Sequence, residues 1–162
     1  MHGSQRLARK RTPALTTMPR AWFAALMAGA GPLAAQTIPE CKRSTFTKAV
    51  SAETVEQQAM LQYRQMLQKA SGDRALAPAE HPQLQRLRYI GARMVPYTRE
   101  CNPRAADWKW EVNLIGSRQI NAFCMPGGKI AFYYGILSEL QLSDDEVAMI
   151  MGHEAAHALL EH

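Results

Sequence analysis

Two histidines and a glutamate near the end of the chain, in the sequence GHEAAHALLEH, have the types and spacing of a metal site. On a helix, His153 and His157 project from one face about one turn apart. Two imidazoles placed in this way can bind one zinc ion, and Glu154 could take a proton from a water on the metal. The pattern therefore indicates a zinc hydrolase, with His153 and His157 as metal ligands and Glu154 as the catalytic base.

A hydrolytic zinc ion needs a third protein ligand, and the residues around the two histidines do not provide one. His162 is nine residues from His153. That spacing places it about 180° away around a continuous helix. The metzincin pattern, in which a further histidine six residues after His157 is the third ligand, is not present either. The alternative is that both histidines are solvent-facing helix residues that bind no metal.

The composition predicts a folded domain that does not bind nucleic acid. The chain has 162 residues, of which 47% are apolar and 20% charged, as is typical of a protein with a packed core. Its net charge of +5 comes from the first 35 residues, which hold five basic residues and no acidic one. The remainder has 14 basic and 14 acidic residues, so the basic surface that nucleic-acid binding requires is missing.

Residues 1–35 have the pattern of a secretory signal peptide. Basic residues precede the apolar run AWFAALMAGAGPLAA, and Ala34 and Ala35 offer a cleavage point. We therefore expect export to the periplasm, or to the outer side of the inner membrane. The alternative is that the segment is an uncleaved membrane anchor, so membrane association stays open. Translation could also begin at Met18 instead of Met1.

The three cysteines of the chain predict one disulfide. None of them lies in a C-x-x-C motif, so neither a thioredoxin motif nor a cysteine zinc site is indicated. Export would expose the thiols to an oxidising compartment. Cys41 lies in an irregular segment and Cys101 follows a helix, so we expect these two to pair and Cys124 to be a buried thiol.

The middle of the chain predicts two helices and a small sheet. After an irregular segment, residues 36–50, apolar residues recur at helical spacing from Ser51 to Ser71 and Gly72, and again over residues 84–95. Three arginines of the second helix are expected to face solvent: Arg86, Arg88 and Arg93. Alternation in WKWEVNL indicates a strand, and two further strands flank the turn at Pro126, Gly127 and Gly128. The order predicts an α+β fold with a small antiparallel sheet.

The last predicted helix begins with a capping box. Ser143 is the N-cap and Glu146, three residues later, is its partner. The helix should continue through the histidines. Apolar residues on the side away from the histidines form a packing stripe: Val147, Met151, Ala155, Ala158 and Leu159.

The hairpin NAFCMPGGKIAFYYGIL followed by DDEVAMIMGHEAAHALLEH resembles the zinc endopeptidases of metallopeptidase family 48. The resemblance covers residues 79–162. It implies a zincin-like fold, protein or peptide substrates among misfolded or membrane-associated proteins, and the roles given above for His153, Glu154 and His157. In that family the third ligand is a glutamate on a later helix. We therefore expect it beyond His162, with residues 51–162 forming the N-terminal part of an incomplete peptidase domain.

The hairpin could also bind substrate. Either of its strands could pair with an extended peptide near the zinc, which makes Asn121, Ala122, Phe123, Gly127 and Gly128 candidate substrate-binding residues. The simpler interpretation is that these residues only form core and turn. A second function therefore stays open, in which the chain is a catalytically incompetent, truncated module that binds unfolded proteins through the hairpin edge.

Overall fold

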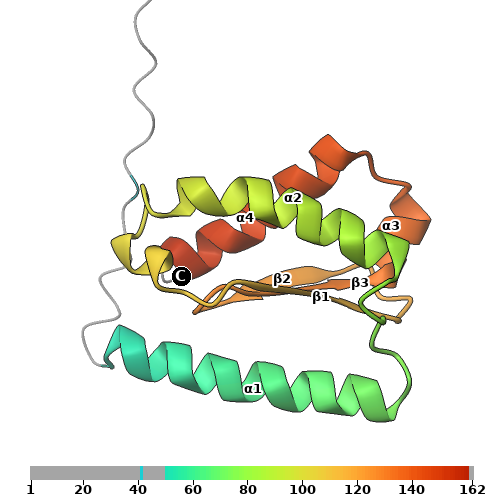
Figure 1. The fold of residues 1–162 in the computed structure, drawn as a ribbon, viewed down its shortest axis with the longest axis horizontal. Coiled ribbons are helices and arrows are strands. Elements are labelled where there is room, and N and C mark those ends of the chain that lie inside the picture. The colour runs from blue at the N-terminus through green and yellow to red at the C-terminus, as the bar shows by residue number, and fades with distance from the viewer. Residues whose placement is uncertain (1–40, 42–49, 161–162) are drawn as a thin grey trace, which may run out of the picture. The chain divides into compact units, whose positions relative to one another are not determined.

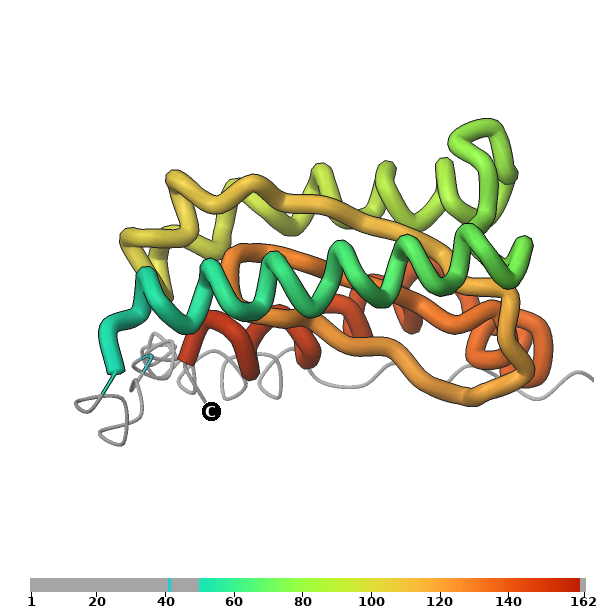
Figure 2. Tube along the Cα trace, turned by 90° about the horizontal axis from the view of Figure 1, so that it is seen from below, coloured from blue at the N-terminus to red at the C-terminus, as the bar shows by residue number. Residues whose placement is uncertain are grey.

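Three strands form a sheet between one helix on one face and two helices on the other (Figure 1). The computed structural model describes Cys41 and residues 50–160. Figure 2 shows α1 running across its face of the sheet. The elements are α1 (Ala52–Gly72), α2 (Pro82–Thr98), the 3-10 helix η3 (Pro103–Ala106), β1 (Glu111–Ile115), β2 (Ala122–Met125), β3 (Lys129–Tyr133), α3 (Tyr134–Leu140) and α4 (Asp144–Leu160).

The helices begin where the sequence places their caps. The Ser51 side chain accepts a hydrogen bond from the Thr54 amide at 3.2 Å, which satisfies one of the free N–H groups at the start of α1. In front of α4, the Ser143 amide donates to Glu146 Oε2 at 2.8 Å and the Glu146 amide donates to Ser143 Oγ at 3.4 Å. The predicted capping box is therefore confirmed.

The sheet is mixed, whereas we predicted an antiparallel one. Its strand order is β1-β3-β2, with β2 antiparallel to β3 and β1 parallel to β3. The hairpin β2–β3 folds back so that its second strand, not its first, lies beside β1. The first strand of the hairpin therefore forms the crossover that a parallel pair requires. The α+β class itself is confirmed.

The predicted strand at residues 108–114 is shifted toward the C-terminus. Trp108 and Trp110 precede β1 and pack against one another, with ring centroids 5.4 Å apart. The second strand of the hairpin ends at Tyr133, and α3 begins directly after it at Tyr134. Gly135 donates its amide to the Ser117 carbonyl at 2.8 Å, and a Cβ there would overlap the carbonyl of Arg118. This close backbone approach ends the strand.

Each face of the sheet has its own core. Leu114, Ile130 and Phe132 face α2 and α4, where they join Leu87 and Met151 in the largest buried cluster. On the opposite face, Ile115 and Ala131 of the sheet pack against Tyr63 and Ala70 of α1. The Tyr63 hydroxyl donates to the Ile130 carbonyl at 2.5 Å and accepts from Asn113 Nδ2 at 3.2 Å. Burial raises the pKa of Tyr63 above its usual range, so the hydroxyl stays protonated.

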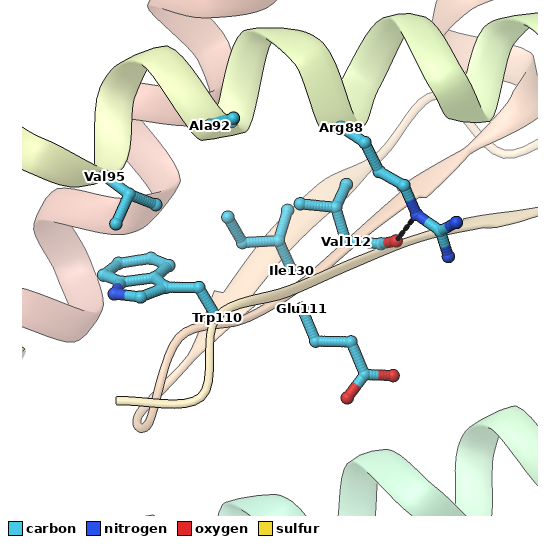
Figure 3. Close-up of a pocket in the computed structure, with 8 residues that line it drawn as sticks. Arg88, Ala92, Val95, Trp110, Glu111, Val112 and Ile130 are labelled. Carbon is cyan, nitrogen blue, oxygen red and sulfur yellow. Dashed lines mark hydrogen bonds between the residues drawn. The ribbon is translucent and has the colours of Figure 1, made fainter. Parts of the chain in front are cut away.

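The outer edge of β1 is covered. In a parallel pair, the N–H and C=O of one residue face the same side, and the Glu111 amide bonds the Gly128 carbonyl beside β3. The backbone N–H and C=O groups of Val112 and Leu114 therefore point away from β3, toward the outer edge of the sheet. The Arg88 side chain donates to the Val112 carbonyl at 3.2 Å (Figure 3), and the Ala77 amide donates to the Leu114 carbonyl at 3.0 Å. Arg88 was predicted to be only a solvent-facing residue; it also covers this sheet edge.

The predicted disulfide joins Cys41 to Cys101, and Cys124 is a free, partly buried thiol. The predicted pairing is therefore confirmed, and Cys124 is unpaired as predicted but only partly buried. No helix among residues 50–160 has the combination of length and hydropathy that crossing a membrane requires. The predicted signal peptide, residues 1–35, lies outside the described residues.

The turn between β2 and β3 depends on glycine. Gly127 and Gly128 have φ values of +84° and +75°, and a Cβ on Gly128 would lie 2.7 Å from the Trp110 ring. We expect Gly128→Ala to lower the free energy of unfolding by about 2–4 kcal/mol, because it combines backbone strain with overpacking. Urea unfolding would measure the change. Gly72→Ala is the control, since nothing lies within 4 Å of a Cβ there. An equal effect in both variants would contradict the assignment of Gly128 to the turn.

Candidate metal centre

His153 and His157 lie on one exposed face of α4 with their rings close together. Their Nε2 atoms are 3.1 Å apart, and the ring planes are nearly perpendicular at 88°. Two nitrogens bound tetrahedrally to one zinc ion at about 2.05 Å are separated by about 3.3 Å. The two rings therefore have the spacing needed to share one ion.

The opposite side of α4 anchors the helix to the rest of the domain. Its buried residues are those of the predicted packing stripe: Val147, Met151, Ala155, Ala158 and Leu159. The helix makes its most extensive contacts with β2, followed by α2. Arg86 of α2 fixes the beginning of α4, since its Nε lies 2.6 Å from Asp144 Oδ1 and its Nη2 donates to the Leu142 carbonyl at 2.7 Å. Arg86 is therefore a packing residue and not merely a solvent-facing one.

Glu154 lies on the part of α4 that faces β2. Its side chain is partly buried and close enough to Cys124 of β2 for their charges to interact. Burial, and to a smaller extent the negative charge of Glu154, raise the pKa of the Cys124 thiol to about 12. Cys124 is therefore a protonated thiol beside the glutamate. A pattern of spacing could not reveal this electrostatic interaction, because the two residues lie on different elements.

The described residues provide two ligands for a metal ion. Among Cys41 and residues 50–160, no third histidine, cysteine or acidic side chain joins His153 and His157 in a group that could hold a metal. His162, which we placed on the other side of the helix, lies outside the described residues. The donor set fits zinc in its chemistry, because imidazole nitrogen is a preferred zinc ligand.

The outer edge of β2 is open. The Tyr133 amide donates to the Asn121 carbonyl at 3.0 Å, so Asn121 faces β3. Because backbone groups alternate along an antiparallel strand, those of Ala122 and Cys124 face away from β3. Within residues 50–160, no backbone hydrogen bond to these outward groups is present. As far as residues 50–160 are concerned, β2 therefore has outward N–H and C=O groups without a backbone partner, whereas the outer edge of β1 is covered.

Residues 80–162 match the sequence profile of peptidase family M48. The chain belongs to this family. The resemblance inferred from the hairpin and the histidine helix is therefore confirmed, and the zincin-like α+β fold agrees with it. No solved structure matches the M48 chain significantly.

Several curated relatives of the M48 chain are named metalloendopeptidase OMA1. The mitochondrial enzyme of Schizosaccharomyces pombe is 30% identical over 143 residues, which cover 86% of this chain and 40% of the relative. The mitochondrial enzyme of Arabidopsis thaliana is 45% identical over 53 residues, 33% of this chain and 11% of the relative. The mitochondrial human enzyme is 33% identical over 66 residues, which cover 39% of this chain and 12% of the relative. The M48 chain thus spans less than half the length of each of these proteins.

These relatives correct the predicted location. We expected export to a periplasm or to the outer side of an inner membrane. The relatives are named as mitochondrial enzymes, so that prediction is wrong. A positively charged, acid-free N-terminus followed by an apolar run does not identify the target membrane, because several targeting systems use basic, acid-poor segments.

The structure divides the predicted substrate-binding residues of the M48 chain into three groups. Ala122 and Phe123 point their side chains into the cores on opposite faces of the sheet, so only their backbone groups could meet a substrate. Gly127 and Gly128 form the turn, where Gly128 packs on Trp110. Asn121 is exposed just before β2. A substrate role for all five stays a prediction.

Proposed function

We propose that this M48 chain is part of a zinc-dependent metalloendopeptidase that hydrolyses peptide bonds in misfolded proteins. The observation that carries the proposal is the 3.1 Å separation of the His153 and His157 Nε2 atoms. This spacing suits one shared ion, and it occurs on the histidine helix of a family M48 peptidase. Residues 51–162 would form the N-terminal part of the peptidase domain. A third ligand would come from outside the described residues.

Three polar residues of α4 have defined tasks in this mechanism. His153 and His157 would hold the zinc ion, which supplies a Lewis acid that polarises the scissile carbonyl. Glu154 is the general base: its carboxylate takes a proton from the attacking water and passes it to the departing amine. The partial burial of Glu154, close enough to Cys124 of β2 to affect its thiol, supports this role, because it places the base next to both His153 and the sheet.

The substrate would bind as an added strand along β2. The outward N–H and C=O groups of Ala122 and Cys124 can pair with an extended peptide through main-chain hydrogen bonds. Such bonds do not depend on side-chain identity, so the site would accept unfolded segments of many sequences. Asn121 would contact the substrate at one end of the strand.

The second candidate is a binding module that holds unfolded chains along β2 without cleaving them. The open edge of β2 favours this candidate as much as it favours the peptidase, because strand addition requires no metal. The two functions differ in whether zinc is needed.

Metal removal tests the proposal. We expect the purified protein to bind zinc and to cleave fluorescent casein. Cleavage should fall to background after treatment with 1,10-phenanthroline and return when zinc is added. Binding of casein to the metal-free protein, measured by fluorescence anisotropy, should persist. Cleavage that survives metal removal would refute the zinc mechanism. Casein binding without cleavage, at full zinc occupancy, would favour the binding module.

A further inference from the structure

The C-terminal turn of α4 rests on the segment that connects α2 to β1. Ala158 and Leu159 of α4 pack in one buried cluster with Ala105 and Trp108 of that segment. His157 lies in this same last turn, whereas His153 lies one turn earlier. The position of one proposed zinc ligand therefore depends on how this turn packs against the connecting segment.

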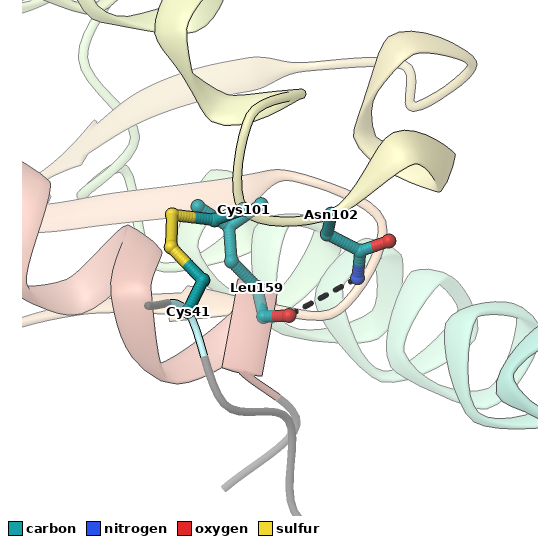
Figure 4. Close-up of a disulfide and its surroundings, with 4 residues drawn as sticks. All are labelled: Cys41, Cys101, Asn102 and Leu159. Atoms are coloured by element: carbon teal, nitrogen blue, oxygen red, sulfur yellow. Dashed lines mark hydrogen bonds between the residues drawn. A yellow bond between two sulfur atoms is a disulfide. The ribbon is translucent and has the colours of Figure 1, made fainter. Parts of the chain in front are cut away.

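Asn102 makes the polar contact in this region (Figure 4). It is fully buried, at 0% exposure, and its Nδ2 donates to the carbonyl of Leu159 at 3.1 Å. This bond joins the buried amide to the backbone of the helix that carries both histidines. The Oδ1 of Asn102 accepts from the Arg104 amide at 3.1 Å and so caps η3. One side chain therefore joins the beginning of η3 to the end of α4.

The segment that carries Asn102 is itself held in place. Arg104 Nε and Nη2 each lie 3.0 Å from a carboxylate oxygen of Glu56 on α1. The indole of Trp108 donates to the same carboxylate at 2.9 Å. Cys101, next to Asn102, is bonded to Cys41. Asn102 is thus a donor on a fixed support, and the last turn of α4 is held relative to α1 as well as to the sheet.

We propose that Asn102 is a positioning residue for the metal centre. It holds the last turn of α4 through the Leu159 carbonyl and thereby keeps the ring of His157 at the separation from His153 that one ion requires. Asn102 acts through the backbone and does not touch the metal or the substrate. This inference rests on the proposed function for its zinc readout, while its effect on the helix can be measured without metal.

Asn102→Ser isolates the contact with α4. Serine keeps a capping oxygen for the Arg104 amide, but its shorter side chain does not reach the Leu159 carbonyl. Asn113→Ser is the matched control: Asn113 is also a buried asparagine, 7% exposed, and its Nδ2 donates to Tyr63 and Glu111 and not to α4. Both variants lose hydrogen bonds donated by a buried asparagine side chain. A general loss of stability should therefore appear in both, whereas an effect on α4 should appear only in Asn102→Ser.

Two measurements test the proposal in the full chain. In the metal-free protein, we expect Asn102→Ser to speed amide hydrogen exchange in the last turn of α4 about tenfold, with the first turn unchanged. In the folded protein, the zinc dissociation constant should rise about 10–100-fold, as is common when a residue that supports a metal ligand is lost. Asn113→Ser should change neither quantity. Should Asn102→Ser fail to fold, Asn102→Asp keeps the shape and the cap, loses the donor, and carries the same expectations.

Unchanged exchange in the last turn of α4 would overturn the proposal. An unchanged zinc dissociation constant, with unfolding midpoints lowered equally in both variants, would also overturn it, because Asn102 would then be only structural. If the parental protein binds no zinc, the proposed function fails. The exchange measurement still decides in that case whether Asn102 holds the last turn of α4.

Discussion

Glu154→Gln is expected to abolish proteolysis and to leave zinc binding intact. Glutamine has nearly the same shape as glutamate, so the packing of α4 against β2 should persist. It cannot accept a proton from the attacking water, however, and loss of a general base typically lowers a rate by about 10²–10⁴-fold. Since Glu154 is not one of the proposed zinc ligands, the metal content should equal that of the parental protein. The measurement is initial-rate cleavage of fluorescent casein together with zinc analysis of the same sample.

Glu146→Gln is the matched control for this experiment. Glu146 lies on the same helix, but its carboxylate is exposed and belongs to the capping box with Ser143. Glutamine serves in that position as well, so activity should remain close to the parental value. If Glu154→Gln cleaved casein at the parental rate, Glu154 would not be the base. Equal losses in both variants would point to a general effect of charge on α4.

Reduction of the Cys41–Cys101 disulfide is expected to have the largest effect on stability. The bond closes a loop with a sequence separation of 60. Restricting the unfolded chain by a loop of this length is worth about 4 kcal/mol in the chain-entropy description. The free energy of unfolding, measured by urea titration with and without dithiothreitol, should therefore be lower by about this amount under reducing conditions.

A variant without the two cysteines provides the control. The double substitution Cys41→Ser and Cys101→Ser should show the lower stability in both buffers, with no response to dithiothreitol. Cys124 remains in this variant, so any residual response would be assigned to its thiol. A parental stability that is the same in both buffers would show that the bond is not formed in solution.

Local signals in the sequence predicted α4 and the placement of His153 and His157 on one face of it best. The capping box, the apolar stripe and the two histidines all depend on residues within one or two helical turns, so spacing alone determines their arrangement. The glycine turn between β2 and β3 was predicted for the same reason, because positive φ values favour glycine. The disulfide was also predicted, from the irregular position of Cys41 and from Cys101 following a helix.

Contacts between distant segments could not be predicted in this way. The parallel pairing of β1 with β3 depends on which hairpin strand lies beside β1, and both strands have similar composition. Burial of Asn113 follows from α1 covering the second face of the sheet, whereas alternation in WKWEVNL suggested one exposed face. The bond from Asn102 to Leu159 joins residues 57 positions apart. Neither residue is part of a local pattern that would indicate the contact.

The unequal edges of the sheet also determine how copies of this chain could associate. A sheet with two open edges can add strands on both sides, and such stacking continues into fibres. Here Arg88 and residues 75–77 cover the outer side of β1, so within the described residues only β2 is free to pair. Two molecules joined β2 to β2 would leave no open edge, and growth would stop at the pair. Among the described residues, the arrangement thus leaves one strand edge unpaired while limiting polymerisation of the protein through its own sheet.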